Sequence, residues 1–316
     1  MTEAYQRPAF SLDKQFIHLA GLGMEMPSLS EFKSVIANIG YYRFKAYMLP
    51  FRNQDRTFVA NASFHDVVAV YSFDQKLRAL VFHRIQELEV SLRVQFNEHM
   101  VAELDCPFWY IREEIVSFAS DDFRATLKKV SSHFHMSNEE FAKYYREKFH
   151  NEVSEQYQGM PPTWMAIELM TFGNLVTFMN GLSDQTIQDY RLDRFAKKHF
   201  GVAKFKTLTN WLLCVRDVRN HTAHHSRLFN RNLRALNGIL NFLTEKVPEV
   251  ESNGKKSQVL NRPYTALAGL QVLSAKQNML KMGPELKSLF DLYPVTARFF
   301  TSMGFPENWQ NEGCFF

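Results

Sequence analysis

Residues 73–93 read FDQKLRALVFHRIQELEVSLR, and this stretch decides the fold class. Its apolar side chains recur at steps of three and four residues, the period of an α-helix with one buried face; they are Leu77, Leu80, Val81, Ile85, Leu88 and Leu92. Charged residues such as Arg78 and Glu87 fall between them. Neither Pro nor Gly interrupts the chain from Phe64 to Glu103, so the pattern predicts one long helix, or two in series.

Helical periodicity continues on both sides of this segment, which indicates an all-α protein built as a helical bundle. We expect a short helix that ends near Pro50, then a polar turn at 53–56. Further helices are predicted over residues 120–131, 138–150, 163–181, 184–199, 204–225, 230–246 and 262–279. The polar residues 251–258 are typical of a linker. The aromatic residues 292–316 are too apolar to be disordered, so we expect them to dock on the body.

Composition narrows the class of protein. The 316 residues are 46% hydrophobic, enough for a sizeable core, and the net charge of +4 is compatible with nucleic acid without demanding it. The three cysteines lie far apart, so we expect neither a disulfide framework nor a zinc knuckle. The N-terminal residues lack the apolar core of a signal peptide, and no stretch approaches the roughly eighteen apolar residues of a membrane span. We therefore expect a cytoplasmic protein with no membrane partner.

The densest polar cluster is CVRDVRNHTAHHSRLFNRNLR, residues 214–234. On a helix, four-residue spacing places Arg216, Asn220 and His224 in one row and Asp217, His221 and His225 in the next. The opposite side is apolar and is predicted to face the core; it holds Trp211, Leu212, Val215 and Val218. The polar rows should therefore line a groove.

These residue types suit RNA cleavage without a metal ion. Histidine can take a proton from the ribose 2′-OH or give one to the leaving 5′ oxygen, because its pKa is near neutrality. Arginine can hold two phosphate oxygens with its planar fork. The spacing alone cannot choose the site, because Arg followed by His also occurs at Arg78/His83, Arg93/His99, Arg194/His199 and Arg216/His221.

A resemblance to a known family indicates which of these Arg and His residues form the candidate site. RNHTAHHSRLFNR (219–231) resembles the core motif of the Abi (abortive-infection) family, which runs Arg-Asn, three residues, His-His, then Arg-Leu-aromatic-Asn-Arg. NIGYYRFKAYMLPFR (38–52), the helix 73–93, PPTWMAIELMTFGNL (161–175) and MGFPENW (303–309) resemble further family segments in the expected order. The resemblance covers nearly the whole chain.

The resemblance implies a fold and an activity. The family is placed in the HEPN superfamily, whose active members carry an Arg-polar-x-x-x-His ribonuclease motif. That implies Arg219, Asn220 and His224 as catalytic residues, with no metal and no cofactor. It also implies a HEPN-like helical core over residues 61–250, an N-terminal addition over 1–60 and a C-terminal helix and tail over 259–316, counted as one unit. Paired motifs in that superfamily imply a homodimer with a composite site.

Residues around the motif have expected supporting roles. RNA-contacting residues are predicted to be Arg216, His225, Arg227, Arg231 and Arg234, although the arginine run could equally be a solvated face. Glu168 lies in the apolar helix segment WMAIELM. A buried carboxylate needs a partner, so we expect Glu168 to support an arginine of the motif helix.

Several alternatives stay open at this point. His224 could be a capping or core histidine, with His221 as the replacement candidate. Asp217 with His221, His224 and His225 could bind zinc, but adjacent histidines on a helix point about 100° apart. For function, the leading hypothesis is an endoribonuclease toxin in antiviral defence. The alternatives are a non-catalytic RNA-binding protein, held by a small non-coding RNA, and a purely structural interaction protein.

Overall fold

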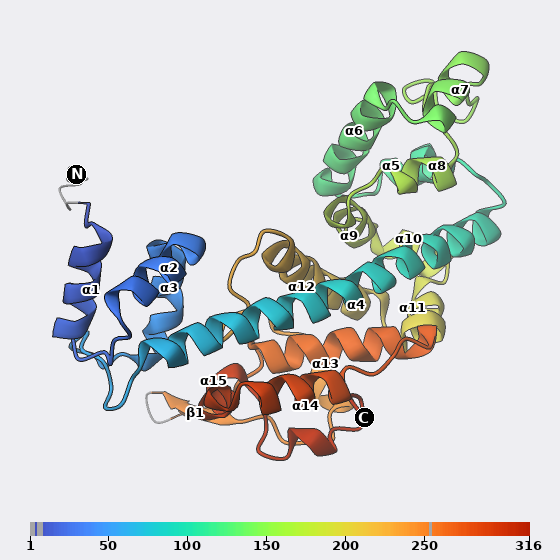
Figure 1. Cartoon of the computed structure of the whole chain (residues 1–316). Coiled ribbons are helices and arrows are strands. Elements are labelled where there is room, and N and C mark those ends of the chain that lie inside the picture. The colour runs from blue at the N-terminus through green and yellow to red at the C-terminus, as the bar shows by residue number, and fades with distance from the viewer. Residues whose placement is uncertain (1–3, 5–8, 253–254) are drawn as a thin grey trace. The chain divides into compact units, whose positions relative to one another are not determined.

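The computed structural model describes residue 4, residues 9–252 and residues 255–316, and within these it forms two compact units (Figure 1). Unit 1 comprises Met1–Leu77 and Ser288–Arg298, and unit 2 comprises Arg78–Lys287 and Phe299–Phe316. The described residues are mostly helical, and their only sheet has two strands. The predicted all-α class is confirmed.

The long central helix is the helix predicted from residues 73–93. Helix α4 (Phe64–Leu104) runs for 41 residues, begins in unit 1 and continues into unit 2 (Figure 1). Five of the six apolar residues that predicted it are at most 2% exposed: Leu77, Val81, Ile85, Leu88 and Leu92. One face of the helix is therefore buried along its length, as the spacing requires.

Unit 1 packs three short helices beside the start of α4: α1 (Leu12–Gly21), α2 (Leu29–Ile39) and α3 (Tyr41–Met48). The chain then makes one turn of 3-10 helix, Leu49–Phe51, so the predicted end near Pro50 is confirmed. The predicted polar turn follows, closed by the amide of Asn53, which donates to the Thr57 carbonyl at 2.9 Å. Within the core, the Tyr47 hydroxyl donates to Asp74 at 2.6 Å.

Unit 2 contains the rest of α4 and the remaining helices and strands. They are α5 (Glu113–Val116), α6 (Asp121–Met136), α7 (Glu140–Lys148), α8 (Thr163–Glu168), α9 (Phe172–Asn180), α10 (Asp184–Asp189), α11 (Leu192–Phe200), α12 (Phe205–Ala223), β1 (Glu249–Ser252), β2 (Lys255–Gln258), α13 (Pro263–Ser274), the start of α14 (Gly283–Leu292) and α15 (Phe300–Met303). Helix α12 packs against α9, α11 and α13, and this arrangement positions the candidate site.

Two segments predicted as single helices are each broken in two. Residues 163–181 form α8 and α9, because the Thr171 side chain caps a new helix by accepting from the Asn174 amide at 3.1 Å. Residues 184–199 form α10 and α11, because Arg191 between them adopts a left-handed backbone with φ 52°. A residue in that conformation ends one helix and redirects the chain before the next.

Two further predictions are wrong. Residues 230–246 are not a helix; they run mostly as irregular chain, with one 3-10 turn at Ile239–Phe242. Their backbone forms hydrogen bonds with other parts of the chain instead; for example, the Leu233 amide donates to the Asn261 carbonyl at 2.8 Å. The described residues of the expected linker are strands instead: residues 251–252 end β1 and residues 255–258 form β2. The two strands pair antiparallel, with Glu249 opposite Gln258 and Glu251 opposite Lys256.

The aromatic tail is docked, as predicted: residues 292–298 belong to unit 1, and Phe299–Phe316 pack within unit 2. Phe305, Trp309 and Phe315 are each at most 2% exposed. The Tyr264 ring of α13 lies 5.2 Å from the ring of Phe305 and 5.8 Å from that of Phe315. Glu312 in the same tail is fully buried and accepts a hydrogen bond from the Tyr264 hydroxyl at 3.0 Å.

Candidate functional site

Helix α12 carries the predicted motif at its C-terminal end. Its apolar side faces the core, because Trp211, Leu212, Val215 and Val218 are all at most 4% exposed, as the sequence predicted. Asp193 holds the other end of the helix by accepting from the Phe205 amide at 2.8 Å. The motif therefore stands on a helix that is anchored along its buried face.

The three motif side chains lie at the solvent side of the helix end. Asn220 and His224 are exposed, and Arg219 is half-buried. The helix ends at Ala223, yet the His224 amide still donates to the Asn220 carbonyl at 3.0 Å, so Asn220 and His224 keep their predicted alignment. The side chains of these three residues form no hydrogen bond or ion pair with another described residue, and Nε of Arg219 is buried without a partner. The Arg219 backbone carbonyl accepts from the Thr222 hydroxyl at 2.8 Å.

The chain turns sharply just after the motif. His225 has a left-handed backbone with φ 55°, which takes its side chain out of the row predicted with His221. The Ser226 amide donates to the His221 carbonyl at 2.8 Å and closes the turn. Burial lowers the pKa of His221, and the nearby Arg231 lowers it further. His221 is therefore a neutral, half-buried neighbour of the motif at pH 7.

Residues 226–237 run back along α12, and we call them the return segment. Arg234 reaches Asp217 of the helix, with Nε 3.6 Å from Oδ2. Further along, the Asn237 carbonyl accepts from Trp211 Nε1 at 2.8 Å, and the Asn237 amide donates to Asn210 Oδ1 at 2.9 Å. The return segment is thus antiparallel to α12 and brings its arginines beside the motif helix.

The apolar residues of the return segment hold it in place. Leu228, Phe229 and Leu236 are at most 3% exposed, and the Phe229 ring lies 5.3 Å from the ring of Phe299. Leu236 packs so closely on α13 that a side chain at Gly269 would collide with it. The irregular backbone is therefore fixed by side-chain burial.

The predicted RNA-contacting arginines are gathered, but not on one helical stripe. Arg227, Arg231 and Arg234 lie on the return segment, which is irregular chain; Arg231 and Arg234 are therefore not on the helix predicted over residues 230–246. Arg231 donates to the Arg227 carbonyl at 3.1 Å. Asp217 links α12 to the return segment. Arg216 Nη2 lies 2.9 Å from its Oδ1, and Arg234 Nε lies 3.6 Å from its Oδ2. Arg216 and Arg234 are thus partly neutralised.

Glu168 does not have the environment that we expected. It is exposed at the end of α8, and none of the described residues forms an ion pair with it. The prediction of a buried carboxylate is wrong because α8 ends at Glu168, so the apolar segment does not enclose it. The neighbour of Arg216 is instead Gly173 of α9, where a Cβ would lie 3.7 Å from Arg216 Cδ.

Among the described residues, no group of three or more His, Cys, Asp or Glu side chains is arranged to hold a metal ion. None of the helices in the described part of the chain combines the length and apolar character that crossing a membrane requires.

The sequence of this chain matches a known protein family. The sequence model of the family described as Abi-like protein matches residues 34–230, which is more than half of the chain. This chain belongs to the Abi-like family. No curated protein and no solved structure matches it. The matched region of this Abi-like protein includes the whole of α12, the motif and the start of the return segment, and family membership supports a role in abortive-infection defence.

Proposed function

We propose that this Abi-like protein is a metal-independent endoribonuclease of the HEPN type that acts in abortive-infection defence. The observation that carries the proposal is the state of the motif: Arg219, Asn220 and His224 stand together at the solvent side of α12, and their side chains have no partners among the described residues. An arginine with a buried, unpaired nitrogen is suited to an external acceptor, and the phosphate of RNA is such an acceptor.

The proposed reaction is transfer of a phosphodiester within the RNA strand. The ribose 2′-oxygen attacks phosphorus as its proton is taken by a base, and the bond from phosphorus to the 5′-oxygen breaks as that oxygen is protonated. The products are a 2′,3′-cyclic phosphate and a 5′-hydroxyl. We assign proton transfer to His224 and phosphate binding to Arg219, and we assign to Asn220 the orientation of His224 or of the phosphate.

The reaction needs both a base and an acid, whereas each chain supplies one motif histidine. We therefore propose a twofold homodimer in which two copies of the motif form one composite site. Isologous twofold contacts are the commonest arrangement of soluble oligomers. Light scattering on active, RNA-free protein tests this directly; a monomer whose activity per molecule is constant down to nanomolar protein would contradict it.

The experiment that tests the proposed activity is RNA cleavage in EDTA by the wild-type protein and its variants. His224→Ala should abolish cleavage with RNA affinity largely kept. Arg219→Ala should lose cleavage and also weaken binding, because a phosphate contact is removed. Asn220→Ala should have the smaller effect.

His133→Ala is the matched control, since His133 is an exposed histidine on α6, and it should cleave at the wild-type rate. The assignment fails if His224→Ala cleaves like the wild type, if cleavage strictly requires added Mg²⁺, or if the products carry 5′-phosphates. RNA binding without cleavage by any of the proteins would favour the non-catalytic alternative.

A further inference from the structure

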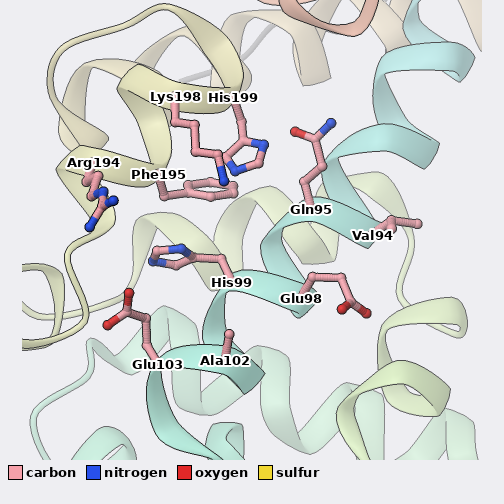
Figure 2. A pocket seen from close by; sticks show the side chains of 10 residues that line it. All are labelled: Val94, Gln95, Glu98, His99, Ala102, Glu103, Arg194, Phe195, Lys198 and His199. Atoms are coloured by element: carbon pink, nitrogen blue, oxygen red, sulfur yellow. The ribbon is translucent and has the colours of Figure 1, made fainter.

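A pocket of about 550 Å³ lies between α4 and α11 in unit 2 (Figure 2). Its volume falls in the range of small-molecule sites, about 300–1,000 Å³. The α4 wall presents Gln95, Glu98 and His99, and the α11 wall presents Arg194, Lys198 and His199. This site does not involve the motif at the end of α12.

The α11 wall carries positive charge that is not neutralised. Arg194 and Lys198 are exposed and lie one helical turn apart, so their side chains share one face of α11. No hydrogen bond or ion pair joins either side chain to another described residue, in contrast to Lys204 just after α11, which pairs with Asp193 at 2.8 Å. Two free cations at this spacing are suited to a phosphate group.

Three aromatic rings from the two walls lie close together in the pocket. The Phe195 ring lies 5.1 Å from the ring of His99 and 5.3 Å from that of His199. His99 is held in place by its Nε2, which lies 2.8 Å from the Tyr190 carbonyl, so it is Nε2 that carries the proton there. Burial lowers the pKa of His199, and Lys198 and His99 lower it further. The two half-buried histidine rings offer flat faces on which a nucleobase can stack.

The α4 wall offers acceptors instead of cations. Gln95 donates from Nε2 to Ser91 Oγ at 2.9 Å, which leaves its buried Oε1 without a partner. Figure 2 shows that oxygen on the side of Gln95 that faces His199. Glu98 is exposed and has no ion pair among the described residues. Such acceptors match ribose hydroxyls or the amino group of a base.

We propose that this pocket binds a nucleotide, either free or as part of an RNA strand. Arg194 and Lys198 hold its phosphate, the rings of His99 and His199 contact its base, and Gln95 and Glu98 accept hydrogen bonds from its ribose or base. A ligand with one anionic end and a donor-bearing aromatic end satisfies both walls at once. The proposal stands without the ribonuclease activity, because none of these residues belongs to the motif.

The test measures binding of AMP, ATP and a short single-stranded RNA to the full chain by calorimetry, all in a His224→Ala background so that the strand stays intact. The double variant Arg194→Gln/Lys198→Gln should weaken binding of the responding ligand at least about tenfold. Lys197→Gln is the matched control: Lys197 is an exposed neighbour on α11 that does not line the pocket, and its change should alter binding less than about twofold.

The two ligand arms separate the sources of the phosphate. Mononucleotide binding that the double variant weakens identifies a free nucleotide as the ligand. RNA binding that it weakens, with no mononucleotide binding to the wild type, identifies an RNA strand. The proposal is overturned if neither ligand distinguishes the double variant from Lys197→Gln, whatever the outcome of the cleavage assay.

Discussion

Replacing Asp217 by Asn should increase the affinity of the protein for RNA. Asp217 lies between Arg216 and Arg234, at 2.9 Å and 3.6 Å, and the three side chains are 25–42% exposed. Asparagine has nearly the same shape but no charge, so both guanidinium groups become available to RNA phosphates. The change should cost little stability, because partly exposed ion pairs contribute only about 0–1 kcal/mol each.

The size of the increase in RNA affinity follows from the two arginines that the substitution releases. Each new contact with a phosphate at an exposed site is worth about 0.2–1 kcal/mol, so two contribute about 0.4–2 kcal/mol. At 1.4 kcal/mol per factor of ten, Kd should fall about 2- to 30-fold. The slope of log K against log salt should become steeper by up to about 1.4, since each neutralised phosphate of a single strand adds about 0.7. Loss of Asp217 also lowers the pKa of His221 further, because the carboxylate raises it.

The assay is fluorescence anisotropy with labelled single-stranded RNA over a series of salt concentrations, in a His224→Ala background. Asp184→Asn is the matched control, because it makes the same change in net charge and releases Lys206 at the other end of α12, where the two groups lie 3.5 Å apart. Equal gains for both variants would show a general charge effect. Weaker binding by Asp217→Asn would show that the carboxylate positions the arginines, and either result would refute the reasoning.

Three other predictions concern stability and can be measured by urea denaturation. Leu236→Ala removes an apolar anchor of the return segment that is 3% exposed, and it should lower the free energy of unfolding by about 2–5 kcal/mol. Glu312→Gln should lower it by about 2–4 kcal/mol, because the fully buried carboxylate accepts from several amide and hydroxyl donors; the exposed Glu307→Gln should have almost no effect. The pKa values of His199 and His221 are lowered from 6.5 in the folded protein, mainly by burial, so below pH 6.5 the unfolded chain binds protons that the folded protein does not. Stability should therefore decrease as pH falls through 6.5, and the decrease should be smaller in a His199→Gln/His221→Gln variant; an unchanged pH dependence would contradict the assignment.

The local periodicity of apolar residues was sufficient to predict the helices that bury one face. It predicted α4 because its apolar spacing continues without Pro or Gly, and it predicted the buried side of α12 for the same reason. The breaks at Thr171 and Arg191 were missed because each depends on the backbone conformation or the capping bond of a single residue. The division of the chain at residues 60 and 250 stays a prediction.

The pocket between α4 and α11 shows a different limit of sequence reasoning. Arg194/His199 has the Arg-then-His spacing, but so do several other pairs, and spacing cannot tell which of them face a common space. His199 lies one helical turn from Phe195 on α11, whereas His99 is a hundred residues away and reaches the Phe195 ring only because α4 packs beside α11. The site could not be predicted from the sequence without knowing that α4 packs beside α11.

The candidate site depends on the same kind of long-range contact. Three arginines on or beside α12 look alike in the sequence, yet the return segment gives them different surroundings. Asp217 forms ion pairs with Arg216 and Arg234. Arg219 forms no ion pair with an acidic side chain among the described residues, and its Nε is buried without a hydrogen-bond partner. An arginine already bound to a carboxylate must give up that partner before it can hold a phosphate, whereas Arg219 has none to give up. The position of Asp217 therefore distinguishes Arg219, which we assign to the reacting phosphate, from Arg216 and Arg234, which we assign to guiding the RNA strand.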